Sequence, residues 1–592
     1  MAHPRPDSLE AALAKVFEDQ NTRASWFALT GGELLFSAGD APDSLYLLRS
    51  GRLGVFRQDE DQPPQFLGVI KPGEPVGEMA LIAGAAHSAS VVALRDSEIL
   101  ALPAEAFFDA VRTQPDVMIE LSRLMLHRAR ERAPGVTEPS VFGFISVRGR
   151  PIRPFVDRVA ASVVAQGFTC QVIDHSALSS VSEWFSRMED THDFVLYVAE
   201  LDEPSWANLC ARQVDRLFLV GNALMAPPAN IPARIAHGLQ QFTDLILLRD
   251  PRMRRPANTA VWLNAINPGR WFHAMEGDAA DAARIARVIT GTAVSLVLSG
   301  GGARAYAHIG AIRALHEAGI RFDFLGGSSM GAVIAAGPAL GWTDDELEAR
   351  IQRAFVRTDP LADLAFPIIA MTRAGKVDRL LEEAYGDIDI ADMPLPFFAV
   401  SSNLTSGRIE VHRRGMLRRA MRASISIPGV MPPVVVNDQV LVDGAVIKNF
   451  PTDVMRHLNA GPIVGVDMSQ MRGVDPATLA NPPSWWRWIV SGAWKKGPPI
   501  VSVLMRSATI TTDADMETSR AETDLLILPE PEGSDIRDWK VYEPVVAAGR
   551  AAALEALSEL KGPVQTLRKR PSGGTPTPFA DEDARPATSA AE

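Results

Sequence analysis

Short apolar runs alternate with helix-compatible segments from Val141 to about Leu560. Runs such as VFGFISV, FVLYVAE and AVSLVLSG have the length and apolar character of buried strands. Strands that alternate with helices form a mainly parallel sheet with helices on its faces. The pattern therefore predicts α/β architecture for most of the chain.

The first part of the chain has a different pattern. From about Ala24 to Pro103, short alternating strands are separated by Gly-Asp, Ser-Gly and Pro-Gly turns, which predicts an all-β barrel or sandwich. Apolar residues at helical spacing then predict a helix from about Ala104 to Arg130. Ala133-Pro134-Gly135 is expected to be the linker that follows it.

The chain has 592 residues, too many for a single hydrophobic core, so we expect a multidomain protein. The expected parts are an N-terminal segment at 1–20, a β-roll domain at 21–135, a central α/β connector domain at 140–290, a C-terminal α/β domain at 293–560 and a tail at 561–592. The tail is rich in Pro, Gly, Ser and Thr and is expected to be disordered.

Charge and cysteine content exclude several classes of protein. The formal net charge of -12 gives no reason to expect a nucleic acid partner. The only cysteines, Cys170 and Cys210, have no ligand spacing, which argues against a disulfide framework or a zinc site. The first residues lack the pattern of a leader peptide, and no run of eighteen apolar residues follows. We therefore expect a cytoplasmic protein without a spanning helix.

The pentapeptide Gly327-Ser328-Ser329-Met330-Gly331 fits the G-x-S-x-G pattern of a nucleophile elbow. It lies between the strand-like FDFLGG and the helix-like MGAVIAAGPAL, the context that such an elbow requires. Small residues such as Gly327 and Gly331 suit these positions, because a sharp strand-to-helix turn brings backbone close to the nucleophile. The pentapeptide alone also fits an ordinary turn, so the assignment of Ser329 depends on its context.

A second glycine-rich loop, Gly300-Gly301-Gly302-Ala303-Arg304, stands one strand-helix unit upstream of the elbow. Several backbone N–H groups can converge on one anion at such a junction and form an oxyanion hole. A phosphate-binding loop or a simple glycine-rich turn is the alternative for this loop by itself. The two loops together favour hydrolysis through a serine nucleophile.

A serine nucleophile needs a base, and the chain offers few histidines for that role. After Ser329 only His412 and His457 occur, and neither stands in a motif that would present a triad member. Asp443 ends an apolar strand and is followed by Gly444 and Ala445, an apparent tight turn. A carboxylate at that point could accept the Ser329 proton directly.

These three motifs, in this order, resemble the catalytic signature of the patatin-like phospholipase family. The resemblance implies a Ser329–Asp443 dyad, oxyanion-hole amides from the 300–302 loop, and a positive charge from Arg304 near the lipid phosphate. The segment SISIPGVMPPV also resembles the family's stretch before its aspartate. Ala305 departs from the pattern, because the family usually has Gly there.

The whole arrangement resembles bacterial relatives of neuropathy target esterase, in which a cyclic-nucleotide-binding-like domain and an α/β connector precede the patatin domain. The β-roll resembles the nucleotide-binding fold around Gly77 and Glu78. In binding members a later Arg pairs with the cyclic phosphate, but here His87, followed by Ser88, takes its place. A mostly neutral imidazole is a poor replacement for a guanidinium. We therefore expect a structural or interaction module, with a cyclic nucleotide effector as the alternative.

Four tryptophans and two lysines between Trp485 and Lys496 fit a membrane interface, or equally a helix packed in the core. The expected function is hydrolysis of phospholipid or lysophospholipid acyl esters, in the cytoplasm or peripherally at the inner membrane. This chemistry requires neither a metal ion nor another cofactor. A lipid acyltransferase with the same acyl-enzyme, and a membrane-associated regulatory scaffold with an inactive hydrolase domain, are the alternatives.

Overall fold

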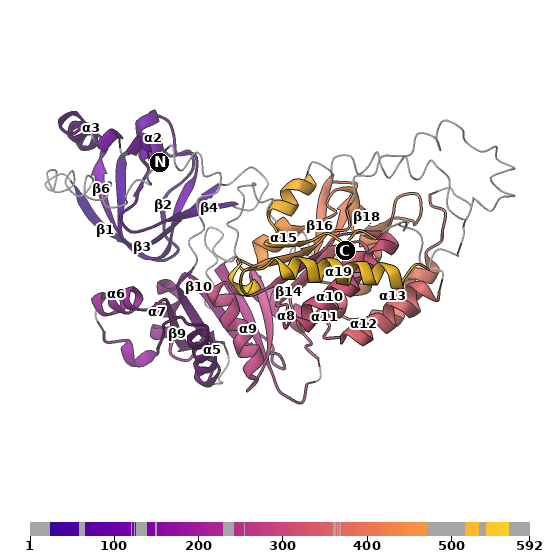
Figure 1. Ribbon diagram of the computed structural model, residues 1–592. Coiled ribbons are helices and arrows are strands. Elements are labelled where there is room, and N and C mark those ends of the chain that lie inside the picture. Colours follow the sequence, from indigo (N-terminus) through magenta and orange to yellow (C-terminus); the bar gives the residue numbers. More distant parts are fainter. Residues whose placement is uncertain are drawn as a thin grey trace, which may run out of the picture. The chain divides into compact units, whose positions relative to one another are not determined.

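In a computed structural model the chain divides into two compact units (Figure 1). One unit comprises Met1–Pro251 with Val261–Ile289 and Arg570–Glu592, and the other Arg252–Ala260 with Thr290–Lys569. The residues described are 24–57, 65–115, 139–147, 151–180, 182–228, 242–253, 255–358, 369–469, 515–531 and 540–567, with isolated positions between 117 and 125 and at 363 and 365. The tryptophan-rich segment and residues 568–592 of the expected tail lie outside them.

The first unit begins with a β-roll whose centre is a long antiparallel pair, β3 with β6. Leu48, Val91 and Ile99 are buried in its core. Helix α3 ends at Thr113, because Pro115 has no amide hydrogen to continue the ladder, and the described residues at 117–119 and 121–123 are helical again, so the helix expected from Ala104 to Arg130 is interrupted at Pro115. The bounds are β1 Ser25–Leu29, β2 Leu34–Phe36, β3 Ser44–Arg57, β4 Gln65–Ile70, β5 Pro75–Val76, α2 Glu78–Ala83, β6 Ser90–Pro103 and α3 Ala104–Thr113.

The connector region of this unit is built on a sheet in the order β12-β11-β10-β7-β9-β8, and every strand pair is parallel. The strands read as continuous apolar runs because helices cover both faces of such a sheet. The bounds are β7 Val141–Ser146, α5 Arg153–Ala165, β8 Cys170–Ile173, α6 Ser182–Thr191, β9 Phe194–Glu200, α7 Pro204–Gln213, β10 Arg216–Asn222, β11 Thr243–Arg249, α8 Thr259–Ile266, β12 Arg270–Met275 and α9 Ala279–Thr290.

The second unit is a mixed sheet in the order β17-β18-β15-β14-β13-β19-β20, with β16 paired to β15. Its strands are β13 Ser295–Leu298, β14 Phe324–Ser328, β15 Phe397–Asn403, β16 Arg408–His412, β17 Val434–Val436, β18 Gln439–Asp443, β19 Ile463–Val466 and β20 Leu525–Ile527. Its helices are η3 Gly302–Tyr306, α10 Ala307–Glu317, α11 Met330–Ala339, α12 Asp344–Ile351, α13 Gly375–Tyr385, α14 Leu417–Ser424, α15 Thr452–Leu458 and α19 Glu543–Ser558.

The strand pairing of β15 brings two distant segments end to end. Strand β16 pairs with residues 399–403 of β15, β14 with residues 397–400, and β18 with residues 401–403. A strand has only two edges, so β14 and β18 share the edge opposite β16. The carboxyl ends of β14 and of the antiparallel β18 therefore face each other, which places Ser329 opposite Asp443.

Helix α19 packs closely along α10 in this unit (Figure 1). The chain stays ordered past the expected start of the tail at 561, because Val564 in the short helix η8 (Val564–Thr566) is buried in the core of the unit. No helix among the described residues combines the length and the apolar character needed to cross a membrane.

Candidate active site

Ser329 stands in a strained turn between β14 and α11. Its backbone has φ 52° and ψ -132°, a conformation that costs a residue other than glycine about 1–3 kcal/mol. A methyl group on Gly331 would lie 2.4 Å from the carbonyl oxygen of Leu298 and 2.4 Å from that of Ser299. The elbow therefore packs directly on the strand and loop of the upstream glycine motif, and a side chain at Gly331 would force them apart.

Asp443 is the hydrogen-bond partner of Ser329. The Ser329 hydroxyl donates to Asp443 Oδ2 at 2.7 Å, and Asp443 Oδ1 accepts from the Ala445 amide at 2.9 Å. Burial raises the pKa of Asp443 to about 6, although both hydrogen bonds favour the charged form. Gly444 is required in this turn, because a methyl group there would lie 2.4 Å from the backbone carbonyl oxygen of Val400.

Ser424, at the end of α14, holds the elbow from a third direction. Its hydroxyl accepts a hydrogen bond from the Ser329 amide at 2.9 Å and donates to the carbonyl oxygen of Val400 at 2.6 Å. All of its surface is buried. The sequence showed Ser424 only as the first residue of a family-like segment, and its contact with the elbow depends on the tertiary fold.

The glycine-rich loop lies against Ser329, because a methyl group on Gly300 would lie 3.0 Å from Ser329 Cβ. The Gly300 amide donates to the Asn449 carbonyl oxygen at 3.3 Å, so in this structure that amide is engaged. Gly301 precedes η3, whose first N–H groups, beginning with Gly302, have no partner within the helix. Asn449 also donates from Nδ2 to the Gly300 carbonyl oxygen at 3.3 Å.

The last two residues of the loop and Ala305 after it are buried. Arg304 is 9% exposed, and Ala303 and Ala305 are packed in the core. His308, on the first turn of α10, hydrogen-bonds through Nε2 to the Ser299 carbonyl oxygen at 2.9 Å. Burial lowers the pKa of His308 to about 4, so its ring is neutral and Nε2 must carry the proton that the carbonyl accepts. Sequence reasoning did not single out His308, since no spacing rule links it to the loop.

The two histidines that follow Ser329 in the sequence have other partners. His412 Nε2 lies 2.7 Å from Ser401 Oγ, and burial lowers the pKa of His412 to about 4. Burial also lowers the pKa of His457, on α15. Among the described residues, neither histidine hydrogen-bonds Ser329 or Asp443.

In the β-roll, His87 stacks on Phe36 with ring centroids 3.7 Å apart. The His87 ring lies beside Gly77, which caps α2 with φ 88°, and Glu78 is buried on the first turn of that helix. Ser88 is exposed. The structure thus brings Gly77, Glu78 and His87 together, and burial lowers the pKa of His87, so the ring presents no fixed positive charge.

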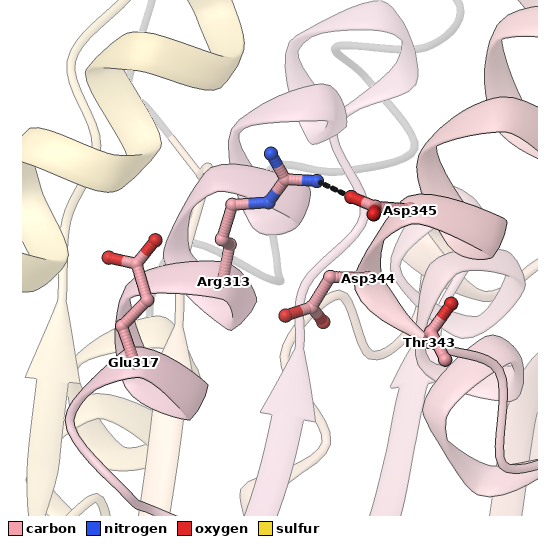
Figure 2. Close-up of a pocket in the computed structure, with 5 residues that line it drawn as sticks. All are labelled: Arg313, Glu317, Thr343, Asp344 and Asp345. Atoms are coloured by element: carbon pink, nitrogen blue, oxygen red, sulfur yellow. Dashed lines mark hydrogen bonds and ion pairs between the residues drawn. The ribbon is translucent and has the colours of Figure 1, made fainter.

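Figure 2 shows a polar hollow lined by Arg313 and Glu317 of α10 and by Thr343, Asp344 and Asp345 at the start of α12. Helix α11 leads away from Ser329 for ten residues, about 15 Å at 1.5 Å per residue, before α12 begins. The charged residues that line the hollow all have partners: Arg313 with Asp345 at 2.8 Å, Asp344 with His316 at 2.8 Å and Glu317 with Arg550 at 2.7 Å. Among the described residues no His, Cys, Asp and Glu cluster is arranged to hold a metal ion.

Comparison with known proteins identifies the domains in the same order as the motifs. Three family models match: a cyclic nucleotide-binding domain at residues 27–114, the neuropathy target esterase (NTE) family P-loop like domain at 152–285, and patatin-like phospholipase at 296–456. An uncharacterized NTE family protein of Mycobacterium bovis is 31% identical over 88% of this chain and 90% of its own length. The chain belongs to the NTE family. It carries a patatin-like phospholipase domain and is a lipid ester hydrolase.

Eukaryotic relatives in this NTE family are longer. The neuropathy target esterase of Drosophila melanogaster is 27% identical over 83% of this chain, a match that covers 39% of the fly protein. A lysophospholipase of Neosartorya fischeri is 26% identical over 90% of this chain and 42% of its own length. The match to these relatives thus spans under half of each of them.

Proposed function

We propose that this NTE family chain hydrolyses acyl esters of phospholipids or lysophospholipids through a Ser329–Asp443 dyad. The observation that carries the proposal is the 2.7 Å hydrogen bond from the Ser329 hydroxyl to the buried Asp443 carboxylate. Asp443 accepts the Ser329 proton while Oγ attacks the ester carbonyl carbon. The departing alcohol takes that proton, and water then attacks the acyl-enzyme to release a fatty acid and restore Ser329.

The oxyanion of each tetrahedral intermediate needs hydrogen-bond donors close to Ser329. The amides of Gly301 and Gly302 are the proposed donors, since the Gly300 amide donates to Asn449. Asn449 bonds both the amide and the carbonyl of Gly300, and His308 bonds the carbonyl of Ser299, so these two residues fix the start of the loop. The lipid substrate class is supported by the patatin-like phospholipase match and by the relative named as a lysophospholipase.

Release of fatty acid from phosphatidylcholine and lysophosphatidylcholine, measured with a metal chelator present, tests this assignment. Ser329→Ala and Asp443→Asn should each reduce release at least roughly 1,000-fold, the scale seen when a nucleophile or its base is removed. Ser328→Ala is the matched control, because Ser328 is fully buried beside the nucleophile and should retain activity within a few fold. Release that survives Ser329→Ala would overturn the proposal.

A further inference from the structure

Two turns beyond the carboxyl end of β15 form one small lobe, which we call the hairpin lobe (residues 403–408 and 434–441). Asn437 and Asp438, with φ 49° and 62°, make the two-residue turn between β17 and β18. The lobe is tied together across its two turns, by Leu404 N to the Val440 carbonyl oxygen at 2.8 Å and by Val440 N to Thr405 Oγ1 at 3.0 Å. Its shape is therefore fixed by the fold.

The hairpin lobe exposes large apolar side chains. Leu404 is 55% exposed, Val435 66% and Val436 41%. Among the described residues of the second unit, only Ile369, Leu528 and Leu554 are other large apolar side chains exposed to this degree. Single exposed apolar residues are ordinary, but three gathered on one rigid protrusion indicate a surface that is covered in use.

The hairpin lobe stands directly beyond the candidate active site. Strand β18 runs from Gln439 in the lobe down to Asp443, which bonds Ser329. Four residues of strand at about 3.3 Å each place Gln439, which follows the turn, about 13 Å from Asp443. A lipid surface that covers the lobe therefore lies within reach of the strand that carries the proposed base.

The charges of the hairpin lobe indicate which kind of surface it can contact. Arg408 and Asp438 are its charged residues, one of each sign, and both are exposed. Docking on an anionic membrane normally uses clusters of Lys or Arg, which the lobe lacks. A surface of zwitterionic lipids offers apolar chains to the valines and leucine and demands no net charge.

We propose that the hairpin lobe docks the hydrolase unit on the surface of zwitterionic lipid aggregates, with Leu404, Val435 and Val436 as the inserted side chains. This inference rests on the proposed lipid hydrolysis at Ser329 and adds the surface from which the substrate is taken. Residues of the lobe take no part in the chemistry, so docking and catalysis can be separated by substitution.

Vesicle flotation of the full chain carrying Ser329→Ala tests the docking without hydrolysis of the vesicles. Adding Leu404→Asp and Val435→Asp should lower binding to phosphatidylcholine vesicles at least tenfold. Without these two substitutions the chain should still bind at high salt, because apolar insertion is not screened. Leu554→Asp, at a 42% exposed position on α19, is the matched control and should bind normally. Val435→Trp should strengthen binding, which keeps the test decisive if the double variant fails to fold.

Activity assays with Ser329 intact separate this inference from the proposed function. The double variant should lose vesicle hydrolysis at least tenfold but retain hydrolysis of a short, water-soluble ester such as p-nitrophenyl butyrate within about twofold. If the native chain cleaves neither substrate, the proposed function fails, whereas the flotation result still decides the docking. Unchanged flotation of the double variant, or equal loss with Leu554→Asp, would overturn the inference. The inference would also be overturned if the native chain formed a dimer that the two substitutions disrupt while vesicle binding persists, because the lobe would then pair two copies of the chain.

Discussion

At the scale of single residues, the pKa of Asp443 sets the pH range in which the proposed dyad can work. Burial raises that pKa to about 6, and only the ionised carboxylate can accept the Ser329 proton. We therefore expect kcat/KM to fall about tenfold per pH unit below pH 6 and to level off above it. A pH profile of kcat/KM on a soluble ester measures this.

His412→Ala is the control and should leave the inflection of the pH profile in place, because the pKa of His412 is about 4. An inflection that moves with this substitution would contradict the assignment of the base to Asp443.

Ser424 acts through Ser329 as a positioning residue. Ser424→Ala removes the acceptor of the Ser329 amide and the donor to Val400, so the strained elbow loses its tether. A displacement of the nucleophile on the order of 1 Å can reduce catalysis by roughly 100-fold. We expect kcat to fall roughly 10- to 100-fold with KM little changed, as measured by steady-state kinetics.

Ser426→Ala is the control for this substitution, because Ser426 is equally buried but its hydroxyl bonds Arg422 instead of the elbow. Equal losses in the two variants, accompanied by equal losses of stability, would show that Ser424 supports only the fold.

At the scale of elements, two glycines let α10 and α19 approach each other. A methyl group on Gly310 would lie 1.9 Å from the carbonyl oxygen of Val546, and one on Gly549 would lie 1.8 Å from that of Ala307. Gly549→Ala must therefore push the helices apart and should destabilise the unit by about 3 kcal/mol, at the upper end of ordinary overpacking. Urea denaturation measures the change. Ala547→Ser, at an exposed position on the same helix, should change stability by less than about 0.5 kcal/mol. An unchanged midpoint for Gly549→Ala would show that the helices can separate without cost.

The elements also show where sequence reasoning succeeds and where it stops. The elbow, the glycine-rich loop and the turn after Asp443 are local, so their glycines announce the close approaches that the structure contains. The meeting of Ser329 with Asp443 depends on β14 and β18 sharing one edge of β15, which no local pattern encodes. Ser424 and Asn449 reach the site from elsewhere in the chain by the same packing, so their types alone gave no signal.

At the scale of the whole molecule, the question is whether the β-roll makes the hydrolase responsive to a cyclic nucleotide. The place of the expected arginine is taken by His87, whose ring is stacked on Phe36 and buried beside Gly77. A cyclic phosphate at this place would have to displace that ring and would find a neutral imidazole where a guanidinium is expected. We expect calorimetric titration with cyclic AMP or cyclic GMP to show no binding, and the rate of ester hydrolysis to be the same with and without either nucleotide.

His87→Arg restores a guanidinium at the position where binding members have one, so any nucleotide affinity should appear in this variant first. Heat of binding in the native chain, lost on substitution of Glu78, would instead show that the domain kept its ligand, and a matching change in hydrolysis rate would make it a regulator.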